Sequence, residues 1–273
     1  MLPLEDGFAD IIGKAQRGLK LSDEVLCREA GVSGEDFQRV KGGDFNEEIV
    51  RKLAEPLRLA PDRLVALGSW HPNIAHPSNL ARVTTPFDGG TVNAYLIWDE
   101  ETKEAALFDT GMDAGPLLQA VRDRGLTPKY IFVTHTHSDH IAELPNLARA
   151  TGLTPLVHES QDIGGVRLFK WGQTFPLGKL KVETRRTTGH AEGGTTFVVS
   201  GPGLDVSIAV VGDAIFAGSM GRGNISHEDA LETNRQSIFS LPDQTVLCPG
   251  HGPLTTVGLE KRHNPFFPEF HHS

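Results

Sequence analysis

Residues 133–140 read VTHTHSDH and place four metal-ligand side chains within six positions: His135, His137, Asp139 and His140. The stretch follows the β-forming run YIFV and precedes a helix-like segment. We therefore expect it in the loop at the C-terminal end of a strand, where open α/β sheets place ligand sites. His135 and His137, two residues apart, project to the same side of an extended chain. Asp139 and His140 follow a turn and approach from another direction, so the stretch suits two neighbouring metal ions better than one.

A second pattern recurs along the rest of the chain: an apolar strand-like run, then a ligand-type side chain beside glycine. It is found at Asp109 in LFDTG, His190 in TTGHAEGG, Asp213 in VVGDAIF and His251 in CPGHG. Because glycine lets the backbone turn tightly, this layout delivers polar groups from several strand ends to one place. Imidazole and carboxylate ligands without a thiolate are compatible with zinc, iron or manganese. The sequence therefore predicts a centre for two divalent metal ions, with Zn²⁺ expected and Fe or Mn as alternatives.

The pattern of apolar residues along the chain changes near residue 80. Beyond it, short β-type runs such as TVNAYLIWD and SIAVVGD alternate with helix-like segments such as AGPLLQAVRDRG. Interleaved strands and helices predict a sheet-based α/β architecture. The preceding stretch GSWHPNIAHPSN is rich in Pro, Asn and Ser and is typical of a linker. We expect a small all-α domain over residues 1–69, a linker over 70–79 and an α/β domain over 80–273.

Residues 1–69 are expected to be helical throughout. Four segments with helical apolar spacing are separated by Gly, Ser, Asn and Pro. Ser22, Ser33 and Asn46 stand where the N-caps of three such helices belong. The sequence thus predicts a small helical unit before the sheets.

Residues 20–67 resemble the Cro/repressor-like helix-turn-helix DNA-binding domains in the rhythm of their helices and turns. The resemblance implies DNA as a partner, contacted through Gln38, Arg39 and Lys41. Residues 1–68, however, contain 10 Lys and Arg against 13 Asp and Glu, the wrong sign for a surface that meets phosphates. We favour a module for packing or homodimerisation, with operator binding as the less favoured alternative.

Composition narrows the classes of protein further. The 273 residues are 38% hydrophobic, and their apolar runs are much shorter than the roughly 20 residues that a membrane helix needs. The start MLPLEDGFAD lacks the basic and apolar regions of a secretory signal. We therefore expect a cytoplasmic protein without membrane contact. A net charge of −9 argues against a large nucleic-acid footprint.

Residues 80–273 resemble the metallo-β-lactamase superfamily, through HxHxDH followed by a separate His, Asp and His in that order. The resemblance implies an αββα sandwich with a dinuclear metal centre along one edge. The implied ligands are His135, His137 and His190 for the first metal, Asp139, His140 and His251 for the second, and Asp213 for both. Asp109 matches the family's aspartate that orients ligands without binding metal, a role that typically matters 10–100-fold.

The reaction that this resemblance implies is hydrolysis. A metal ion lowers the pKa of bound water from about 15.7 to about 7, so a metal-bridging hydroxide is expected to attack a polarised carbonyl carbon. No side-chain nucleophile is required. Besides binding metal, Asp139 is expected to orient the water or take a proton.

Within the superfamily, DAIFAGSMGRGN and CPGHGPLTTVGLEKRHNPFF resemble stretches of the compact glyoxalase II-like thioesterases, the hydroxyacylglutathione hydrolase type. A small-molecule thioester or related ester is therefore the expected substrate. Two features depart from the family's pattern. The chain ends 22 residues after His251, too soon for the helical domain with which larger members hold glutathione. Ala191 and Glu192 stand where the family usually has Thr-Pro, so the acyl group and the thiol carrier stay open.

Two alternatives to a dinuclear hydrolase remain. The first is a persulfide dioxygenase with a single iron, whose family usually carries an alanine before the last histidine ligand. Gly250 at that position favours hydrolysis. The second is a transcription regulator in which the metal domain senses a metabolite and the N-terminal unit binds an operator. RNA-processing nucleases share HxHxDH, but their inserted domain and basic surface are not visible in this sequence.

Overall fold

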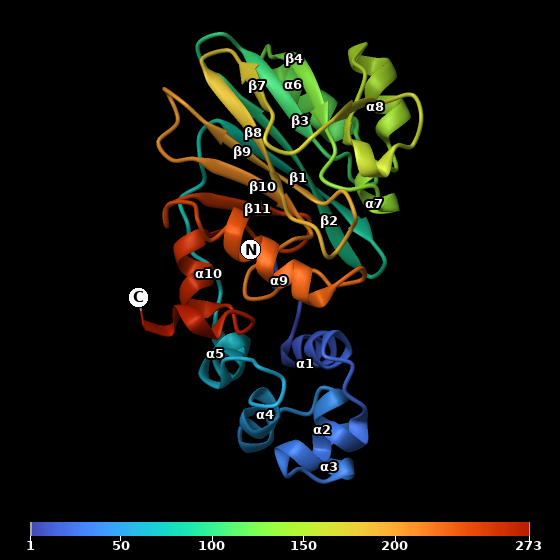
Figure 1. Ribbon diagram of the computed structural model, residues 1–273. Coiled ribbons are helices and arrows are strands. Elements are labelled where there is room, and N and C mark those ends of the chain that lie inside the picture. The colour runs from blue at the N-terminus through green and yellow to red at the C-terminus, as the bar shows by residue number, and fades with distance from the viewer. Residues whose placement is uncertain (1, 273) are drawn as a thin grey trace.

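Two six-stranded sheets face each other in the larger part of the computed structural model, which describes residues 2–272 (Figure 1). The first sheet has the order β1-β2-β3-β4-β5-β6 and the second β12-β11-β10-β9-β8-β7. The strands of the first sheet are β1 (Leu80–Phe87), β2 (Gly90–Trp98), β3 (Glu104–Phe108), β4 (Thr127–Phe132), β5 (Leu156–His158) and β6 (Arg167–Phe169). Those of the second are β7 (Thr174–Leu177), β8 (Leu180–Arg186), β9 (Thr195–Ser200), β10 (Ile208–Gly212), β11 (Val246–Pro249) and β12 (Thr255–Thr256).

Aromatic side chains fill the space between the two sheets. Phe108 and Phe132 of the first sheet lie with ring centroids 5.6 and 4.8 Å from that of Phe197 in the second. All three are fully buried, and burial of such a side chain stabilises a fold by roughly 1.5–3 kcal/mol. The inward-facing positions of the strands therefore form one core between the sheets.

Helices cover the outer faces of both sheets. On the first, Leu117 and Leu147 pack in one cluster with strand residues. On the second, Ala230 and Val257 pack with Ala209 of β10. The helices are α6 (Gly115–Asp123), α7 (Ser138–Ile141), α8 (Leu144–Thr151), α9 (His227–Ser237) and α10 (Val257–His263), with the 3-10 turns η2 (Glu159–Gln161) and η3 (Pro268–His272). The predicted α/β fold with an αββα sandwich is thus confirmed.

Parallel pairing decides which ends of the strands meet. In the first sheet β3 pairs parallel to β4, and in the second β10 pairs parallel to β11. Parallel strands end at the same edge of a sheet, so the residues that follow them emerge side by side. This edge is where the predicted metal-ligand side chains leave the sandwich.

Five short helices form a lobe at one end of the sandwich (Figure 1). They are α1 (Phe8–Gly18), α2 (Asp23–Ala30), α3 (Gly34–Lys41), α4 (Glu47–Ala54) and α5 (Pro61–Ala66), followed by the 3-10 turn η1 (Leu67–Ser69). The side chains of Ser22, Ser33 and Asn46 each accept a backbone N–H in the first turn of the helix that follows. Each satisfies an orphan donor of its helix, which confirms the three predicted N-caps.

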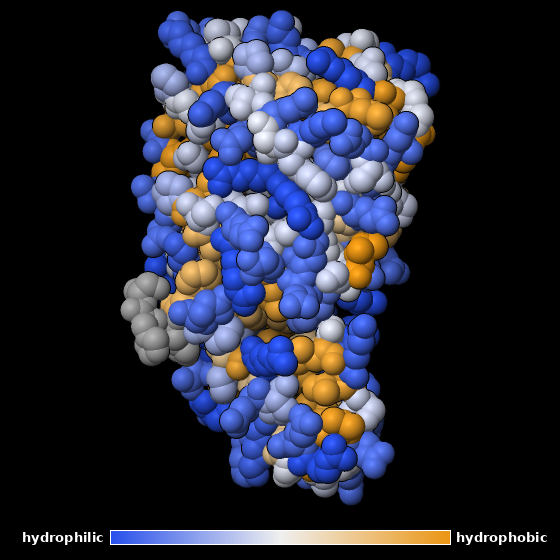
Figure 2. Space-filling model, in the orientation of Figure 1, coloured by the Kyte–Doolittle hydropathy of each residue, from blue (hydrophilic) through white to orange (hydrophobic). Residues whose placement is uncertain are grey.

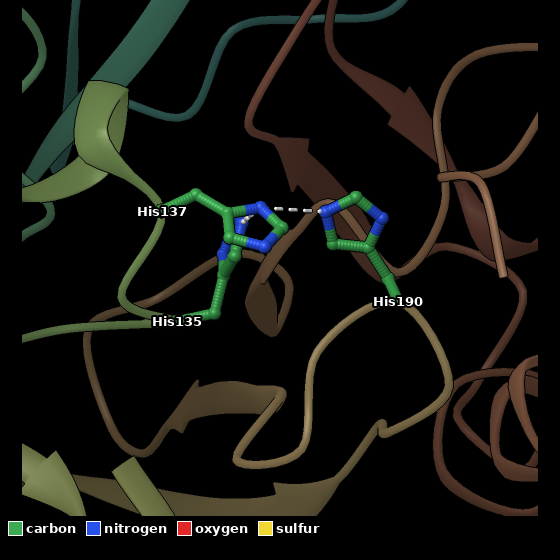
Figure 3. Close-up of side chains that lie close together, drawn as sticks. All are labelled: His135, His137 and His190. Atoms are coloured by element: carbon green, nitrogen blue, oxygen red, sulfur yellow. Dashed lines mark hydrogen bonds between the residues drawn. The ribbon is translucent and has the colours of Figure 1, made fainter. Parts of the chain in front are cut away.

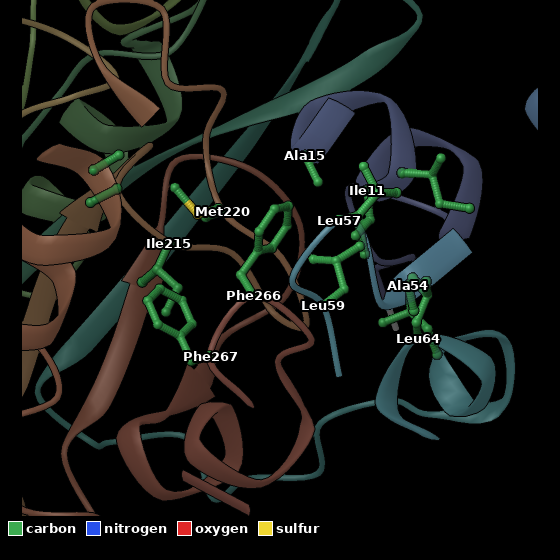
Figure 4. Close-up of a cluster of buried hydrophobic side chains, with 14 of the residues drawn as sticks. Ile11, Ala15, Ala54, Leu57, Leu59, Leu64, Ile215, Met220, Phe266 and Phe267 are labelled. Atoms are coloured by element: carbon green, nitrogen blue, oxygen red, sulfur yellow. The ribbon is translucent and has the colours of Figure 1, made fainter. Parts of the chain in front are cut away.

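The helical lobe shares an apolar core with the C-terminal part of the sandwich. Ile11 and Leu57 belong to the same buried cluster as Phe266, and Figure 4 shows the two sets of side chains facing each other. Buried Arg63 reinforces the contact, since its Nη1 donates to the carbonyls of Asn264 (3.0 Å) and Phe267 (2.8 Å). The lobe therefore docks through a packed interface. Residues 70–79 between the two parts form neither helix nor strand.

The polar groups of α3 that the helix-turn-helix resemblance assigns to DNA lie beside acids of the lobe itself. Arg39 pairs with Asp44 at 2.6 Å. Gln38 and Lys41 contact Asp23 at 3.0 and 3.2 Å. The helix-turn-helix assignment stays a prediction.

The surface of the lobe also carries apolar side chains (Figure 2). Phe45 is 49% exposed, and its ring packs edge-on against that of Phe8 at 5.3 Å.

None of the helices in the described range 2–272 is long and apolar enough to cross a bilayer.

Glu260 in α10 is a fully buried acid that holds a turn of the chain beside the lobe. Its carboxylate accepts hydrogen bonds from Gly218 N (3.0 Å), Asn264 Nδ2 (2.9 Å) and Thr255 Oγ1 (2.7 Å). Burial raises its pKa to about 7, although these donors oppose the shift. The acid thus titrates near neutrality in the folded protein.

We expect Glu260 to lower the free energy of unfolding as the pH rises from about 4.5 to 7. Its folded pKa of about 7 exceeds the unfolded value of about 4.3, so the folded protein binds more protons in this window. The variant Glu260→Gln cannot ionise and lacks this contribution. Between pH 5 and pH 8 the wild type is expected to lose about 2 kcal/mol relative to the variant, measured by urea unfolding. Parallel pH profiles of the two proteins would contradict the expectation.

Candidate metal centre

The VTHTHSDH stretch follows β4 and spans the start of a short helix. His135 and His137 lie in the loop after Phe132, and Asp139 and His140 lie in α7. His137 is the N-cap of α7 and is extended, at φ −68° and ψ 151°. The change from extended chain to helix turns the two pairs of side chains toward the site from different directions.

The structure brings all seven predicted metal-ligand side chains together. Asp213 follows β10, His251 follows β11, and His190 lies in the loop between β8 and β9. The seven form three overlapping groups, and within each group the ligand atoms lie within 4.8 Å of one another. The groups are His135, His137 and His190; His135, His140 and Asp213; and Asp139, His140 and His251. Side chains up to 116 residues apart in the sequence, from His135 to His251, therefore converge on one edge of the sandwich.

Three imidazoles form the first group (Figure 3). Nδ1 of His137 lies 3.0 Å from Nε2 of His135 and 3.0 Å from Nε2 of His190. Nitrogens held about 2.1 Å from one tetrahedral zinc ion lie roughly 3.4 Å apart, close to this spacing. The three rings are thus arranged to share a single cation.

Asp213 lies between this first group and the second. One of its oxygens, Oδ2, is 3.4 Å from Nε2 of His190 and 3.4 Å from Nε2 of His251. Its other oxygen, Oδ1, is 3.3 Å from Nε2 of His140. Asp139 completes the second group, with Oδ2 at 3.4 Å from His140 Nε2 and 3.3 Å from His251 Nε2. A carboxylate in the place of Asp213 can serve two cations at once.

Asp109 fixes His140 and the start of the loop through hydrogen bonds. Nδ1 of His140 donates to Asp109 Oδ2 at 2.8 Å, and Thr134 donates through its backbone N (2.7 Å) and Oγ1 (2.8 Å). Asp109 has a φ of +59°, a left-handed conformation that is uncommon for residues other than glycine. Its contacts match those of a residue that orients ligands, since no group of ligand atoms includes it.

Backbone carbonyls fix two further imidazoles. Nδ1 of His190 donates to the carbonyl of Arg222 at 2.8 Å. Nδ1 of His251 donates to the carbonyl of Thr91 at 2.7 Å. In a neutral histidine, donation from Nδ1 leaves Nε2 free of a proton, which is the form that binds metal. Both Nε2 atoms point at Asp213.

Two buried atoms test whether the site fits a metal ion. Nε2 of His140 and Oδ1 of Asp213 lie 3.3 Å apart without hydrogen-bond geometry, and neither atom has a hydrogen-bond partner among the described residues. Buried polar atoms are nearly always paired, and leaving one unpaired costs about 1–3 kcal/mol. A cation satisfies both atoms, because it accepts lone pairs from nitrogen and oxygen alike. The residues present therefore fit a metal centre.

Two of the clustered histidines have a lowered pKa and two have a raised pKa. Burial lowers the pKa of His135 and of His190. Burial opposes the charge on His140 and His251 too, but neighbouring carboxylates outweigh it and raise these pKa values to about 10 and about 11. Cations bound to the carboxylates displace such protons, so metal binding here is coupled to proton release.

A cavity of about 320 Å³ opens beside the first group. Its lining consists of Thr136, His137, Ser160, Gln161, Asp162, Ile163, His190, Ala191, Glu192, Asn224 and Ile225. Ile163 and Ile225 are 44% and 59% exposed, which gives the cavity an apolar rim. Glu192 is exposed and lines the cavity. Gln161 and Ile225 carried no sequence signal, because residues of these types are common in any loop.

His158 is the last residue of β5. Its ring stacks on that of Trp171 at 3.7 Å and is buried. The cavity lining does not include it.

Comparisons with known proteins add the family context. A family model described as "Metallo-beta-lactamase superfamily" matches residues 87–251. The chain is 29% identical over 199 residues to hydroxyacylglutathione hydrolase GloC of Haemophilus influenzae. The aligned region covers 64% of this chain and 92% of the relative. The chain is also 29% identical over 181 residues to the mitochondrial persulfide dioxygenase ETHE1 of Homo sapiens, covering 63% and 69%. The crystal structure of TTHA1623 in a di-iron-bound form matches with a TM-score of 0.55 and 29% identity, over 68% of this chain and 99% of that one.

Proposed function

Because the chain belongs to the metallo-β-lactamase superfamily, as the match over residues 87–251 shows, we propose that it is a dinuclear metal-dependent hydrolase of thioesters or related esters. The observation that carries the proposal is the place of Asp213 between two groups of imidazoles. A single metal ion needs only one of these groups. The likeness to GloC supports a thioester of the hydroxyacylglutathione type as the substrate.

The residues that would hold the two metal ions follow from the groups. His135, His137 and His190 would hold one ion, Asp139, His140 and His251 the other, and Asp213 both. Divalent ions at these groups would supply a hydroxide at neutral pH. We expect zinc. Iron is compatible with the same ligands, and the similar TTHA1623 structure contains two iron ions.

The remaining steps belong to the side chains of this protein. Asp139 has its carboxylate at the second group, which supports a role in orienting the attacking water or taking its proton. Asp109 keeps His140 in one orientation through the Nδ1 hydrogen bond. The cavity beside the first group is the expected seat of the substrate, with aliphatic contacts from Ile163 and Ile225.

The protein purified without added metal is expected to contain about two metal ions per chain and to hydrolyse S-lactoylglutathione or a similar thioester. Removal of the metal with a chelator is expected to abolish hydrolysis, because the hydroxide is lost. Addition of zinc to the stripped protein is expected to restore it. Elemental analysis and a thioester assay on one preparation measure both quantities. A metal-loaded protein that hydrolyses no thioester or ester would refute the proposal.

A persulfide dioxygenase is the second candidate, and the likeness to ETHE1 favours it. It requires one iron per chain and oxygen uptake with a persulfide. It also requires little dependence of activity on Asp139 and His251. The same elemental analysis, with an oxygen electrode in place of the thioester assay, distinguishes it from the hydrolase.

Regulation of transcription is a third candidate with less support. The acids beside Gln38, Arg39 and Lys41 compete with phosphate for these side chains. We propose that the helical lobe serves packing and access to the site. A cytoplasmic location and a homodimer formed through the lobe remain predictions.

A further inference from the structure

We propose that the buried ion pair between Asp6 and Lys14 positions the metal centre from the helical lobe. The pair lies at α1 and the segment before it, and it contacts the loop between β10 and α9, residues 213–226. That loop begins with Asp213. The inference rests on the proposed function, since it concerns the same site. It gives the lobe a role in the reaction.

The ion pair is completed by the loop. Nζ of Lys14 donates to Oδ2 of Asp6 at 2.5 Å and to the carbonyl of Met220 at 2.9 Å. The same Oδ2 accepts from Oγ of Ser219 at 2.6 Å. Both charged side chains are largely buried, with 12% and 8% exposed. A buried pair is favourable only when its other polar atoms are also bonded, and here the loop supplies those bonds.

Met220 lies two residues before the backbone carbonyl that orients His190. Two residues further on, the carbonyl of Arg222 accepts the Nδ1 hydrogen bond of His190. Between them, Gly221 lies so close to Asp213 that a Cβ on it would be 1.9 Å from the Asp213 carbonyl oxygen. A shift of Gly221 toward Asp213 would therefore displace Asp213, and a shift of this segment would also move the carbonyl that orients His190.

A second route leads from Lys14 to the other side of the centre. Its Nζ lies 5.0 Å from the centroid of the Phe216 ring. That ring meets the imidazole of His251 edge-on, at 5.6 Å and an interplanar angle of 87°. The segment before α1 also packs close to Gly252, the residue after His251. A Cβ on Gly252 would lie 3.2 Å from the backbone N of Glu5. The lobe therefore touches the surroundings of both groups of metal-ligand side chains.

The lobe has other anchors, so the role of the ion pair can be separated from docking. The apolar cluster around Ile11, Leu57 and Phe266 holds α1 and α4 against the sandwich (Figure 4). Arg63 bonds two carbonyls near the C-terminal end. Loss of the Lys14 ammonium leaves these contacts intact.

Lys14→Met removes the charge and the donors but keeps an unbranched side chain only one atom shorter. In zinc competition against a chelator, it is expected to lower metal affinity by up to roughly 10-fold, the lower end of the effect of a group bonded directly to a ligand, because Lys14 acts through the loop backbone. Hydrogen exchange of residues 216–222 in the metal-free protein is expected to accelerate. In the thioester assay, kcat is expected to fall more than KM changes. Lys14→Arg keeps the charge and is expected to restore most of the affinity.

Lys52→Met is the matched control, because Lys52 pairs with Glu48 at 2.6 Å on the exposed face of α4. It is expected to leave metal affinity, exchange and kinetics unchanged. If Lys14→Met does not fold, Ser219→Ala removes only the hydroxyl that bonds Asp6, and a smaller change in the same direction is expected. Wild-type metal affinity and wild-type exchange in the folded variant would overturn the inference. Both readouts need no substrate, so failure of the thioester assay in the wild type would refute the proposed function alone.

Discussion

Asp213→Ala is expected to lower kcat/KM for thioester hydrolysis by roughly 10³-fold or more, because several kcal/mol of metal stabilisation are lost and each 1.36 kcal/mol is tenfold. The carboxylate lies 3.3–3.4 Å from the Nε2 atoms of His140, His190 and His251. No other described carboxylate belongs to the group formed with His135 and His140. Alanine thus removes the one side chain that joins the two groups.

Elemental analysis of Asp213→Ala is expected to show fewer than two metal ions per chain. Asp243→Ala is the control, since Asp243 is 61% exposed and pairs with Lys261 on the surface. That control is expected to keep wild-type metal content and activity. Unchanged hydrolysis by Asp213→Ala would remove the basis of the dinuclear proposal.

The convergence of these imidazoles and carboxylates could be predicted from the sequence because its signal is chemical and local. An imidazole or carboxylate beside glycine recurs at four strand ends, and parallel pairing of β3 with β4 and of β10 with β11 brings strand ends to one edge. The N-caps Ser22, Ser33 and Asn46 were predictable for a similar reason, since a cap depends on residues only two or three positions away. Both kinds of prediction require little knowledge of tertiary structure.

The link between the lobe and the loop was not predictable in this way. Lys14 reads as an ordinary polar position on an amphipathic helix, and its partner Met220 lies 206 residues away. The same holds for Asp6 and Ser219, which are 213 residues apart. Periodicity reports which face of α1 is buried and says nothing about which surface covers that face. Docking depends on complementary surfaces that form only after both parts have folded.

Gly250 lies beside Asp213, the carboxylate that we propose to serve both metal ions. Its N donates to the carbonyl of Gly212 at 2.9 Å, and its own carbonyl accepts from Asn93 N at 2.7 Å. A Cβ at Gly250 would lie 2.2 Å from Asp213 Oδ1 and 2.7 Å from His140 Cε1. Because the backbone is held on both sides, the two side chains must give way.

Gly250→Ala is therefore expected to bind about one metal ion per chain and to hydrolyse thioesters roughly 10²–10³-fold more slowly, because Asp213 no longer reaches both groups. Elemental analysis and kcat/KM measure the two effects. Gly34→Ala is the control, since a Cβ there meets no atom within 4 Å, and it is expected to retain full activity. A Gly250→Ala protein with two metal ions and wild-type kcat/KM would show that the centre tolerates the methyl group, and would exclude steric control by residue 250. Oxygen uptake with a persulfide by this variant, absent in the wild type, would show that the same contact separates the two chemistries.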